Sequence, residues 1–158
     1  MFLFQVFVSN IAGPAVMSIF IVSLCIYLYM KGYQKDCDRI LFSVCIAMAC
    51  TYTVKLLAHV PRPINSLIVE RDFRFPSGHA TMAAVVSSLA IYYTYTHVKH
   101  ARTRKLLYIL AVCWFMLVAY ARLFLMVHLP IDILVGGVIG VLVTMAVIHM
   151  FKHLHYYK

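Results

Sequence analysis

The sequence contains few charged residues, and acidic residues are the scarcest among them. Asp and Glu together number five in 158 residues, and all charged types make up 12% of the chain. Soluble domains carry charge on about 25% of their residues, so this chain has too little charge to cover a water-exposed surface. Because 64% of its residues are hydrophobic, a disordered chain is also excluded. The composition indicates an integral membrane protein of about one domain.

The sequence also lacks the patterns of disulfide frameworks and metal sites. Its five cysteines form no CxxC pair and have no Cys/His spacing typical of metal ligands. Four of them lie in apolar runs, and we interpret them as small packing residues. His149 and His153 are four residues apart, and we interpret them as interfacial residues near the C-terminus. We therefore expect no metal and no other cofactor.

Long runs without charge divide the chain into segments that can cross a bilayer. A span needs about 20 apolar residues, and no charged residue occurs between Met1 and Met30. No basic region or cleavage site follows Met1, so we expect this first run to be retained. We expect one domain over residues 1–158, an all-α bundle of about five transmembrane helices that follows an interfacial segment at residues 1–10. The predicted transmembrane helices are 11–30, 40–58, 78–97, 105–123 and 131–151.

Basic residues are distributed unequally between the two ends of these helices. A net charge of +9 would suggest a nucleic-acid partner in a soluble protein, but membrane proteins concentrate Lys and Arg in their cytoplasmic loops. We therefore expect no nucleic-acid partner. Five spans place most of the 14 basic residues on one side, which we expect to be cytoplasmic, with the N-terminus outside. These residues are Lys31, Lys35, Arg39, Lys99, Arg102, Arg104, Lys105, Lys152 and Lys158.

The remaining basic residues gather at the opposite, extracytoplasmic helix ends. Such side chains are costly near apolar helix ends unless they are paired or solvated, and Asp132 alone cannot neutralise them. Phosphate suits this cluster, because Arg binds it in a bidentate manner and Lys as a point charge. Ser77 and Gly78 add backbone N–H groups at a helix start, which also favours an anion. The sequence thus predicts a phosphate site at the ends of the last four helices. The basic residues of this cluster are Lys55, Arg62, Arg71, Arg74 and Arg122.

Two histidines give this binding site the means for chemistry. His128 and Asp132 are four residues apart, so the carboxylate can reach one ring nitrogen on a near-helical path. This contact would fix the tautomer and raise the basicity of the other nitrogen, as in a serine-protease triad. Such a histidine can attack phosphorus, while His79 can protonate the leaving oxygen. The cations would then neutralise the transition state in place of a metal ion.

These residues resemble the three-part signature of the type 2 phosphatidic acid phosphatase superfamily, which includes membrane lipid phosphatases and vanadium haloperoxidases. The resemblance implies that His128 is the phosphorylated nucleophile, that Asp132 is its partner, and that His79 is the acid for the leaving group. Two features depart from the family pattern: Ala121 replaces the usual serine, and we count five spans where many members have six. The three parts are Lys55-x6-Arg62-Pro63, Pro76-Ser77-Gly78-His79 and Arg122-x5-His128-x3-Asp132. The implied phosphate-binding residues are Lys55, Arg62, Ser77, Gly78 and Arg122.

We therefore expect an integral membrane lipid phosphatase that hydrolyses a lipid mono- or diphosphate through a phosphohistidine, without a metal. Bacterial relatives act on undecaprenyl diphosphate, phosphatidylglycerol phosphate, phosphatidic acid or lipid A phosphate, and the sequence leaves this choice open. The small size suggests a bacterial inner-membrane protein whose site faces the periplasm. The alternative is a non-enzymatic transporter or binding protein for anions or phospholipids, against which the apolar helix centres argue. Arg71 and Arg74, with Glu70 and Asp72, either lie in a solvated loop or bind a second phosphate or headgroup.

Overall fold

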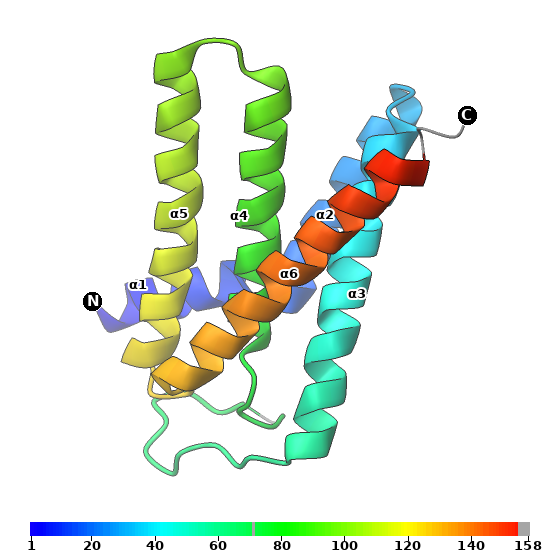
Figure 1. Cartoon of the computed structure of the whole chain (residues 1–158). Coiled ribbons are helices and arrows are strands. Elements are labelled where there is room, and N and C mark those ends of the chain that lie inside the picture. The colour runs from blue at the N-terminus through cyan, green and yellow to red at the C-terminus, as the bar shows by residue number, and fades with distance from the viewer. Residues whose placement is uncertain (71, 155–158) are drawn as a thin grey trace.

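The computed structural model describes residues 1–70 and 72–154, and this part of the chain is all helical, as predicted (Figure 1). Five of its helices match the predicted spans to within a few residues, although the third helix begins at Gln34 and the fifth at Ala101. The segment at residues 1–10 forms a separate short helix. The helices of the described residues are α1 (Phe2–Ile11), α2 (Pro14–Met30), α3 (Gln34–Ala58), α4 (Gly78–His97), α5 (Ala101–Phe124) and α6 (Pro130–Leu154).

Three helices, α3, α5 and α6, are each long and apolar enough to cross a membrane, and the pair α1–α2 makes a fourth candidate if it is taken as one bent span. The chain is therefore an integral membrane protein. Helix α4 falls outside this set because it carries many small and polar residues, and it packs against α3, α5 and α6 inside the bundle. The prediction of about five spans needs α4 to cross as well, and it stays a prediction.

Helix α1 is bent away from α2 and lies across the bundle. The two helices meet at an angle of 45°. Pro14 occupies the first turn of α2, where proline is well tolerated because an N–H group at this position would have no partner within the helix. Figure 1 shows α1 lying across α5 rather than along it, and the two helices are in contact. This orientation is the one expected of a segment that lies at the membrane surface.

Helices α4 and α6 pack closely because glycines of α6 face the backbone of α4. A Cβ atom at Gly136 would lie 2.5 Å from the carbonyl oxygen of Ser77, and one at Gly140 would lie 2.6 Å from that of Thr81. No side chain fits in either place. The close approach holds the start of α4, where the Pro76–His79 motif lies, against the start of α6.

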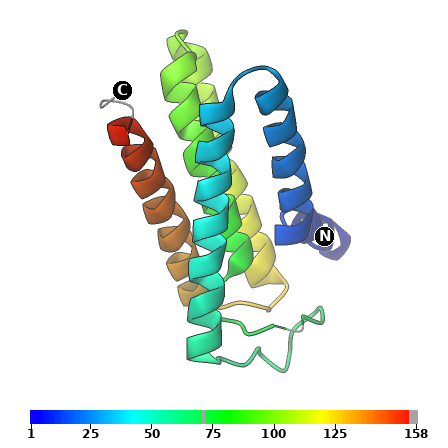
Figure 2. The same cartoon turned by 90° about the vertical axis from the view of Figure 1, so that its right-hand side faces the viewer.

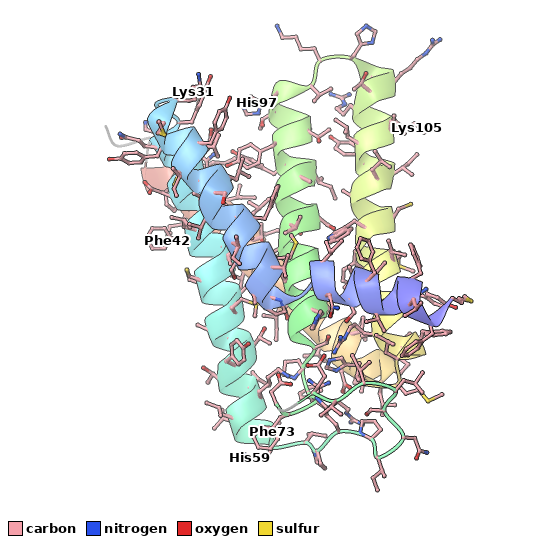
Figure 3. The ribbon with its side chains drawn as sticks, turned by 180° about the vertical axis from the view of Figure 1, so that it is seen from behind. Lys31, Phe42, His59, Phe73, His97 and Lys105 are labelled. Atoms are coloured by element: carbon pink, nitrogen blue, oxygen red, sulfur yellow. The ribbon has the colours of Figure 1, made fainter. Side chains whose placement is uncertain are left out.

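The two ends of the bundle carry different connections. Figure 3 shows Lys31, His97 and Lys105 at one end and His59 and Phe73 at the other. The short turns after α2 and α4 lie at the first end, whereas the long loop at residues 59–77 and the connection from α5 to α6 meet at the second, as Figure 2 also shows. The sequence motifs lie at this second end.

Candidate active site

A polar cavity of about 320 Å³ lies where the 59–77 loop meets the helix ends. Five of the predicted site residues line it: Lys55, Arg62, Gly78, His79 and His128. The other three, Ser77, Arg122 and Asp132, are fully buried behind this lining. The cavity is therefore built around the residues that the sequence motifs single out.

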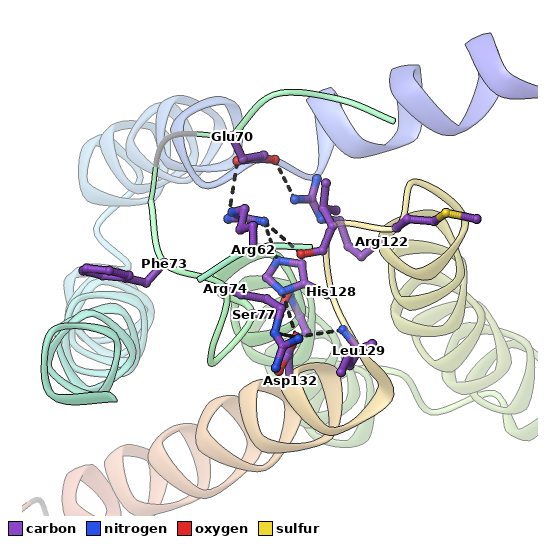
Figure 4. A network of polar contacts seen from close by, with 12 residues as sticks. Arg62, Glu70, Phe73, Arg74, Ser77, Arg122, His128, Leu129 and Asp132 are labelled. Atoms are coloured by element: carbon purple, nitrogen blue, oxygen red, sulfur yellow. Dashed lines mark hydrogen bonds and ion pairs between the residues drawn. The ribbon is translucent and has the colours of Figure 1, made fainter. Parts of the chain in front are cut away.

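His128 lies between Asp132 and the cations. Its Nδ1 atom is 3.5 Å from Oδ2 of Asp132, and its Nε2 atom is 3.5 Å from Nη1 of Arg62. Both side chains of the His128–Asp132 pair are almost fully buried. Figure 4 shows the ring between Arg62 on one side and Asp132 on the other. One ring nitrogen thus faces the carboxylate, and the other faces the place where an anion would bind.

The surroundings of His128 keep its imidazole neutral. Burial is the main cause that lowers the pKa of His128 to about 4, and the nearby charges of Arg122 and Arg62 lower it further. The nearby carboxylate of Asp132 opposes this shift without overcoming it. A neutral imidazole is the form that can act as a nucleophile.

The cations of the cluster are paired with two carboxylates of the 59–77 loop. Asp72 contacts Nζ of Lys55 at 2.8 Å and also pairs with Arg62. Glu70 bridges two arginines, with one oxygen 2.5 Å from Nη2 of Arg122 and the other 3.7 Å from Nη2 of Arg62. The cations therefore have counter-charges besides Asp132, which the sequence argument for phosphate did not take into account. Glu70 and Asp72 were missed because nothing in the sequence fixes the path of the loop.

Asp72 lies among the cations in its charged form. Burial raises the pKa of Asp72, but hydrogen bonds from Lys55 and Arg62 outweigh it and lower the pKa below the usual value for an aspartate. An ionised carboxylate between Lys and Arg presents the same kind of charged acceptor as a phosphate oxygen. The two loop carboxylates therefore stand where the sequence predicts phosphate.

Arg74 faces Asp132. Its Nε atom lies 3.0 Å from Oδ2 of Asp132, and its backbone N–H donates to the carbonyl of Val60 at 2.9 Å. Neither alternative from the sequence, a solvated loop or a second phosphate site, describes this ion pair between a half-buried arginine and a buried aspartate. Arg71 lies outside the described residues.

Ser77 joins the starts of α4 and α6. Its hydroxyl accepts a hydrogen bond from the backbone N–H of Ala80 at 3.3 Å, and its own N–H donates to the carbonyl of Asp132 at 3.0 Å. In this geometry the polar groups of Ser77 cap the helix and hold Asp132. Gly78 and His79, which follow it, line the cavity.

Arg122 is held by a residue that the sequence analysis did not identify. Its Nη1 atom donates to the hydroxyl of Ser9 in α1. Ser9 and Gln5 are both buried, and they lie four residues apart in a segment whose one other polar residue is Asn10. That spacing, which puts both on one helix face, was the available signal.

Within residues 1–70 and 72–154, no three His, Cys, Asp or Glu side chains are grouped as metal ligands would be.

Known proteins resemble this chain in sequence and in fold. Phosphatidylglycerophosphatase B of Bacillus subtilis (strain 168) is 36% identical over 77 residues, which is 48% of this chain and 38% of that relative. The match thus spans well under half of the relative's length. The crystal structure of the first transmembrane PAP2-type phosphatidylglycerolphosphate phosphatase from Bacillus subtilis superposes with a TM-score of 0.84 at 23% identity, covering 96% of this chain and 77% of that one.

A second solved structure, LpxE of Aquifex aeolicus, has a TM-score of 0.74 at 19% identity and covers 94% of this chain and 85% of that one. These two likenesses show the fold. The family model of the PAP2 superfamily matches residues 38–156, a range that includes all three sequence motifs. Since this match extends over well more than half of the chain, the resemblance noted in the sequence is confirmed, and the chain belongs to the PAP2 superfamily.

Proposed function

We propose that the protein is a membrane lipid phosphatase that hydrolyses a lipid mono- or diphosphate through a phosphohistidine at His128. The observation that carries this proposal is the placement of one neutral imidazole, with Nδ1 facing Asp132 and Nε2 facing Arg62 in a polar cavity. A ring oriented by a carboxylate on one side has its free nitrogen available for attack on the other.

The chemistry follows from the residues around the cavity. Nε2 of His128 attacks phosphorus, and the bond from phosphorus to the leaving oxygen breaks. His79, which takes up a proton when the anionic phosphate binds beside it, gives that proton to the leaving oxygen. Water then gives a proton back to His79 as its oxygen attacks the phosphohistidine and the N–P bond breaks, which releases inorganic phosphate and restores both the neutral His128 ring and protonated His79. Lys55, Arg62 and Arg122 stabilise the charge that develops on the phosphoryl oxygens.

The walls of the cavity support a lipid substrate. Besides its polar lining, the cavity is bounded by Pro14 and Ala15 at the start of α2 and by Tyr52 of α3, whose side chain is 48% exposed on the bundle surface. A lipid phosphate enters from the outer leaflet past α2 and α3, so that its headgroup reaches His128 while its chains stay in the bilayer.

Among the four candidate lipids, phosphatidylglycerol phosphate is the substrate that we propose first. The Bacillus subtilis relative that matches in sequence and the Bacillus subtilis crystal structure that matches in fold are both named as phosphatases of this lipid. Undecaprenyl diphosphate, phosphatidic acid and lipid A phosphate remain the comparison substrates.

The proposed setting is the inner membrane of a bacterium. Residues 1–158 form one domain in which α2 to α6 cross the bilayer, α1 lies at its outer surface, and the cavity faces the periplasm. The excess of Lys and Arg in the loops at the opposite end supports this orientation.

The rival function, a transporter or binding protein, needs a polar path through the middle of the bundle. The buried hydroxyls there are instead bonded to backbone carbonyls: Ser87 donates to Ala111 at 2.7 Å, and Thr144 donates to Gly140 at 2.7 Å. These bonds argue for the enzyme, because they leave the hydroxyls no free donor for a passing solute.

Phosphate release by the purified protein in detergent tests the proposal. The four lipids are compared at equal concentration with EDTA present, and His128→Ala is the control. We expect release from at least one lipid, fastest from phosphatidylglycerol phosphate, and inhibition by orthovanadate, which can imitate the five-coordinate phosphoryl state. Release from none of the lipids, or release only after Mg²⁺ is added, contradicts the proposal.

A further inference from the structure

The N-terminal helix α1 reaches the phosphate site through one hydroxyl group. Ser9 is 2% exposed and Arg122 is 0% exposed, and the hydroxyl of Ser9 accepts a hydrogen bond from Nη1 of Arg122. The contact joins residues that are 113 positions apart in the chain. A bond between two fully buried groups fixes the direction of the guanidinium, because neither partner can exchange it for water.

The fold turns this face of α1 toward the site. Gln5, Val8, Ser9 and Ala12 are buried and follow one another at helical spacing. Just beyond them, a Cβ atom at Gly13 would lie 3.7 Å from Nε2 of His79. The junction of α1 and α2 therefore adjoins the cavity, and Ser9 lies on the side of α1 that faces it.

Arg122 has two side-chain partners among the described residues, and they differ in charge. Glu70 is an anion, it lines the cavity, and its carboxylate bridges Arg62 and Arg122. An incoming phosphate competes with Glu70 for the same two guanidinium groups. Ser9 is neutral and does not compete with an anion, so its bond to Nη1 persists while Nη2 changes partner.

We propose that Ser9 is a positioning residue, which fixes the guanidinium of Arg122 so that Nη2 meets the phosphoryl group. The inference rests on the proposed function and extends its site to α1, which lies outside the segment at residues 38–156 that matches the family. Ser9 also supplies a hydroxyl beside Arg122. The family pattern usually has a serine immediately before this arginine, and in this chain that residue is Ala121.

Ser9→Ala, compared with Asn10→Ala, tests this role. Asn10 is the exposed polar neighbour of Ser9 on the same helix. We expect Ser9→Ala to raise the inhibition constant of orthovanadate about tenfold and to lower kcat/KM by a similar factor, since a hydrogen bond to a charged group has about this effect. Asn10→Ala leaves both constants within twofold, and Ser9→Thr, which keeps the hydroxyl, stays close to the wild type.

A double-mutant cycle with Arg122→Lys shows whether Ser9 acts through Arg122. In the Arg122→Lys background, Ser9→Ala changes orthovanadate affinity less than twofold, because the partner of the hydroxyl has already been removed. Binding of orthovanadate is measured by calorimetry in all four proteins, so the cycle does not depend on turnover.

Two results overturn the inference. One is a Ser9→Ala protein with reduced thermal stability and unchanged orthovanadate affinity, since this is the signature of a purely structural contact. The other is an equal loss of affinity in the presence and absence of Arg122. A wild type that binds orthovanadate but releases no phosphate from any lipid contradicts the proposed function instead, and the calorimetric cycle then still decides the role of Ser9.

Discussion

Arg74 and His128 both contact the same carboxylate oxygen of Asp132. Oδ2 of Asp132 lies 3.0 Å from Nε of Arg74 and 3.5 Å from Nδ1 of His128, and it also accepts the backbone N–H of Leu129 at 2.7 Å. Of the two side chains, Arg74 makes the shorter contact. The charge of Arg74 therefore offsets part of the negative charge of Asp132 that would otherwise act on His128.

Replacing Arg74 is expected to change the pH dependence of turnover. His128 must be neutral to attack, and its low pKa, about 4, keeps it so through the weakly acidic range. In Arg74→Gln the carboxylate of Asp132 acts more fully on the ring, which raises the pKa of His128 because a nearby anion favours the protonated form. We expect the acid limb of kcat/KM to move up by about one pH unit.

Arg74→Lys is the matched control, because it keeps a positive charge beside Asp132. Its acid limb stays near that of the wild type. An Arg74→Gln profile that superposes on the wild type, or that shifts to lower pH, contradicts the role assigned to Arg74.

Asp72→Asn separates the two tasks of the loop carboxylates, which are pairing with cations and occupying the place of phosphate. Lys55 is 3% exposed and loses its counter-charge in this variant, which destabilises the fold because the cation is left buried and unpaired. Inorganic phosphate or orthovanadate then restores the missing charge. We expect a lower Tm without the anion and a larger rise in Tm when the anion is added, since a ligand that binds only the folded state stabilises it.

Asp38→Asn serves as the comparison for this measurement. Asp38 is an exposed carboxylate in the first turns of α3, at the opposite end of that helix from Lys55. Thermal unfolding with and without phosphate shows the difference. The same anion-induced rise in Tm for both variants and the wild type contradicts competition between Asp72 and phosphate.

The close packing of α6 on α4 predicts that alanine at two adjacent glycines, Gly136 and Gly137, has effects of different size on stability and activity. In Gly136→Ala the new methyl group meets the carbonyl oxygen of Ser77 at 2.5 Å, so the start of α4 must move. In Gly137→Ala it meets the ring of Phe115 at 3.0 Å, and a side chain can turn away. We expect Gly136→Ala to lower the free energy of unfolding by about 1–3 kcal/mol, as overpacking does, and to lower kcat/KM as well.

Gly137→Ala is expected to keep kcat/KM near the wild-type value, with a smaller change in stability. Chemical denaturation in detergent and steady-state kinetics measure the two effects. Equal losses of activity in both variants contradict the claim that the contact between Gly136 and Ser77 positions the catalytic motif.

Cysteine labelling tests the proposed orientation. Asn65 and Thr103 are both exposed and lie at opposite ends of the bundle, in the 59–77 loop and in the first turn of α5. In intact spheroplasts, a membrane-impermeant thiol reagent is expected to label Asn65→Cys and not Thr103→Cys. The parent protein, which carries five cysteines of its own, gives the background. The reverse labelling pattern places the site in the cytoplasm.

The sequence was sufficient to predict the helices and the gathering of motifs at one end. Runs without charge mark the five helices α2 to α6, because lipid tolerates few ionised groups. The spacing of His128 and Asp132 predicted their contact, since residues four apart meet on a helical path. These features depend on local sequence, which is why they could be predicted.

The partners of the cations could not be predicted in the same way. Glu70, Asp72 and Arg74 lie in a loop without periodicity, so their contacts depend on the path of the backbone between α3 and α4. Ser9 reaches Arg122 only because the chain bends between α1 and α2, so that α1 lies across the bundle. These contacts join distant segments, and no local pattern specifies which segment lies beside which.

Capture of the covalent intermediate tests the central claim most directly. The wild-type protein is mixed with phosphatidylglycerol phosphate labelled with ³²P in its terminal phosphate, quenched within milliseconds in alkali, which preserves phosphohistidine, and digested for mass spectrometry. The account predicts a phosphoryl group on His128 that appears before free phosphate, and no labelled protein in His128→Ala. Phosphate release by the wild type without label on His128, or label that persists in His128→Ala, would contradict it.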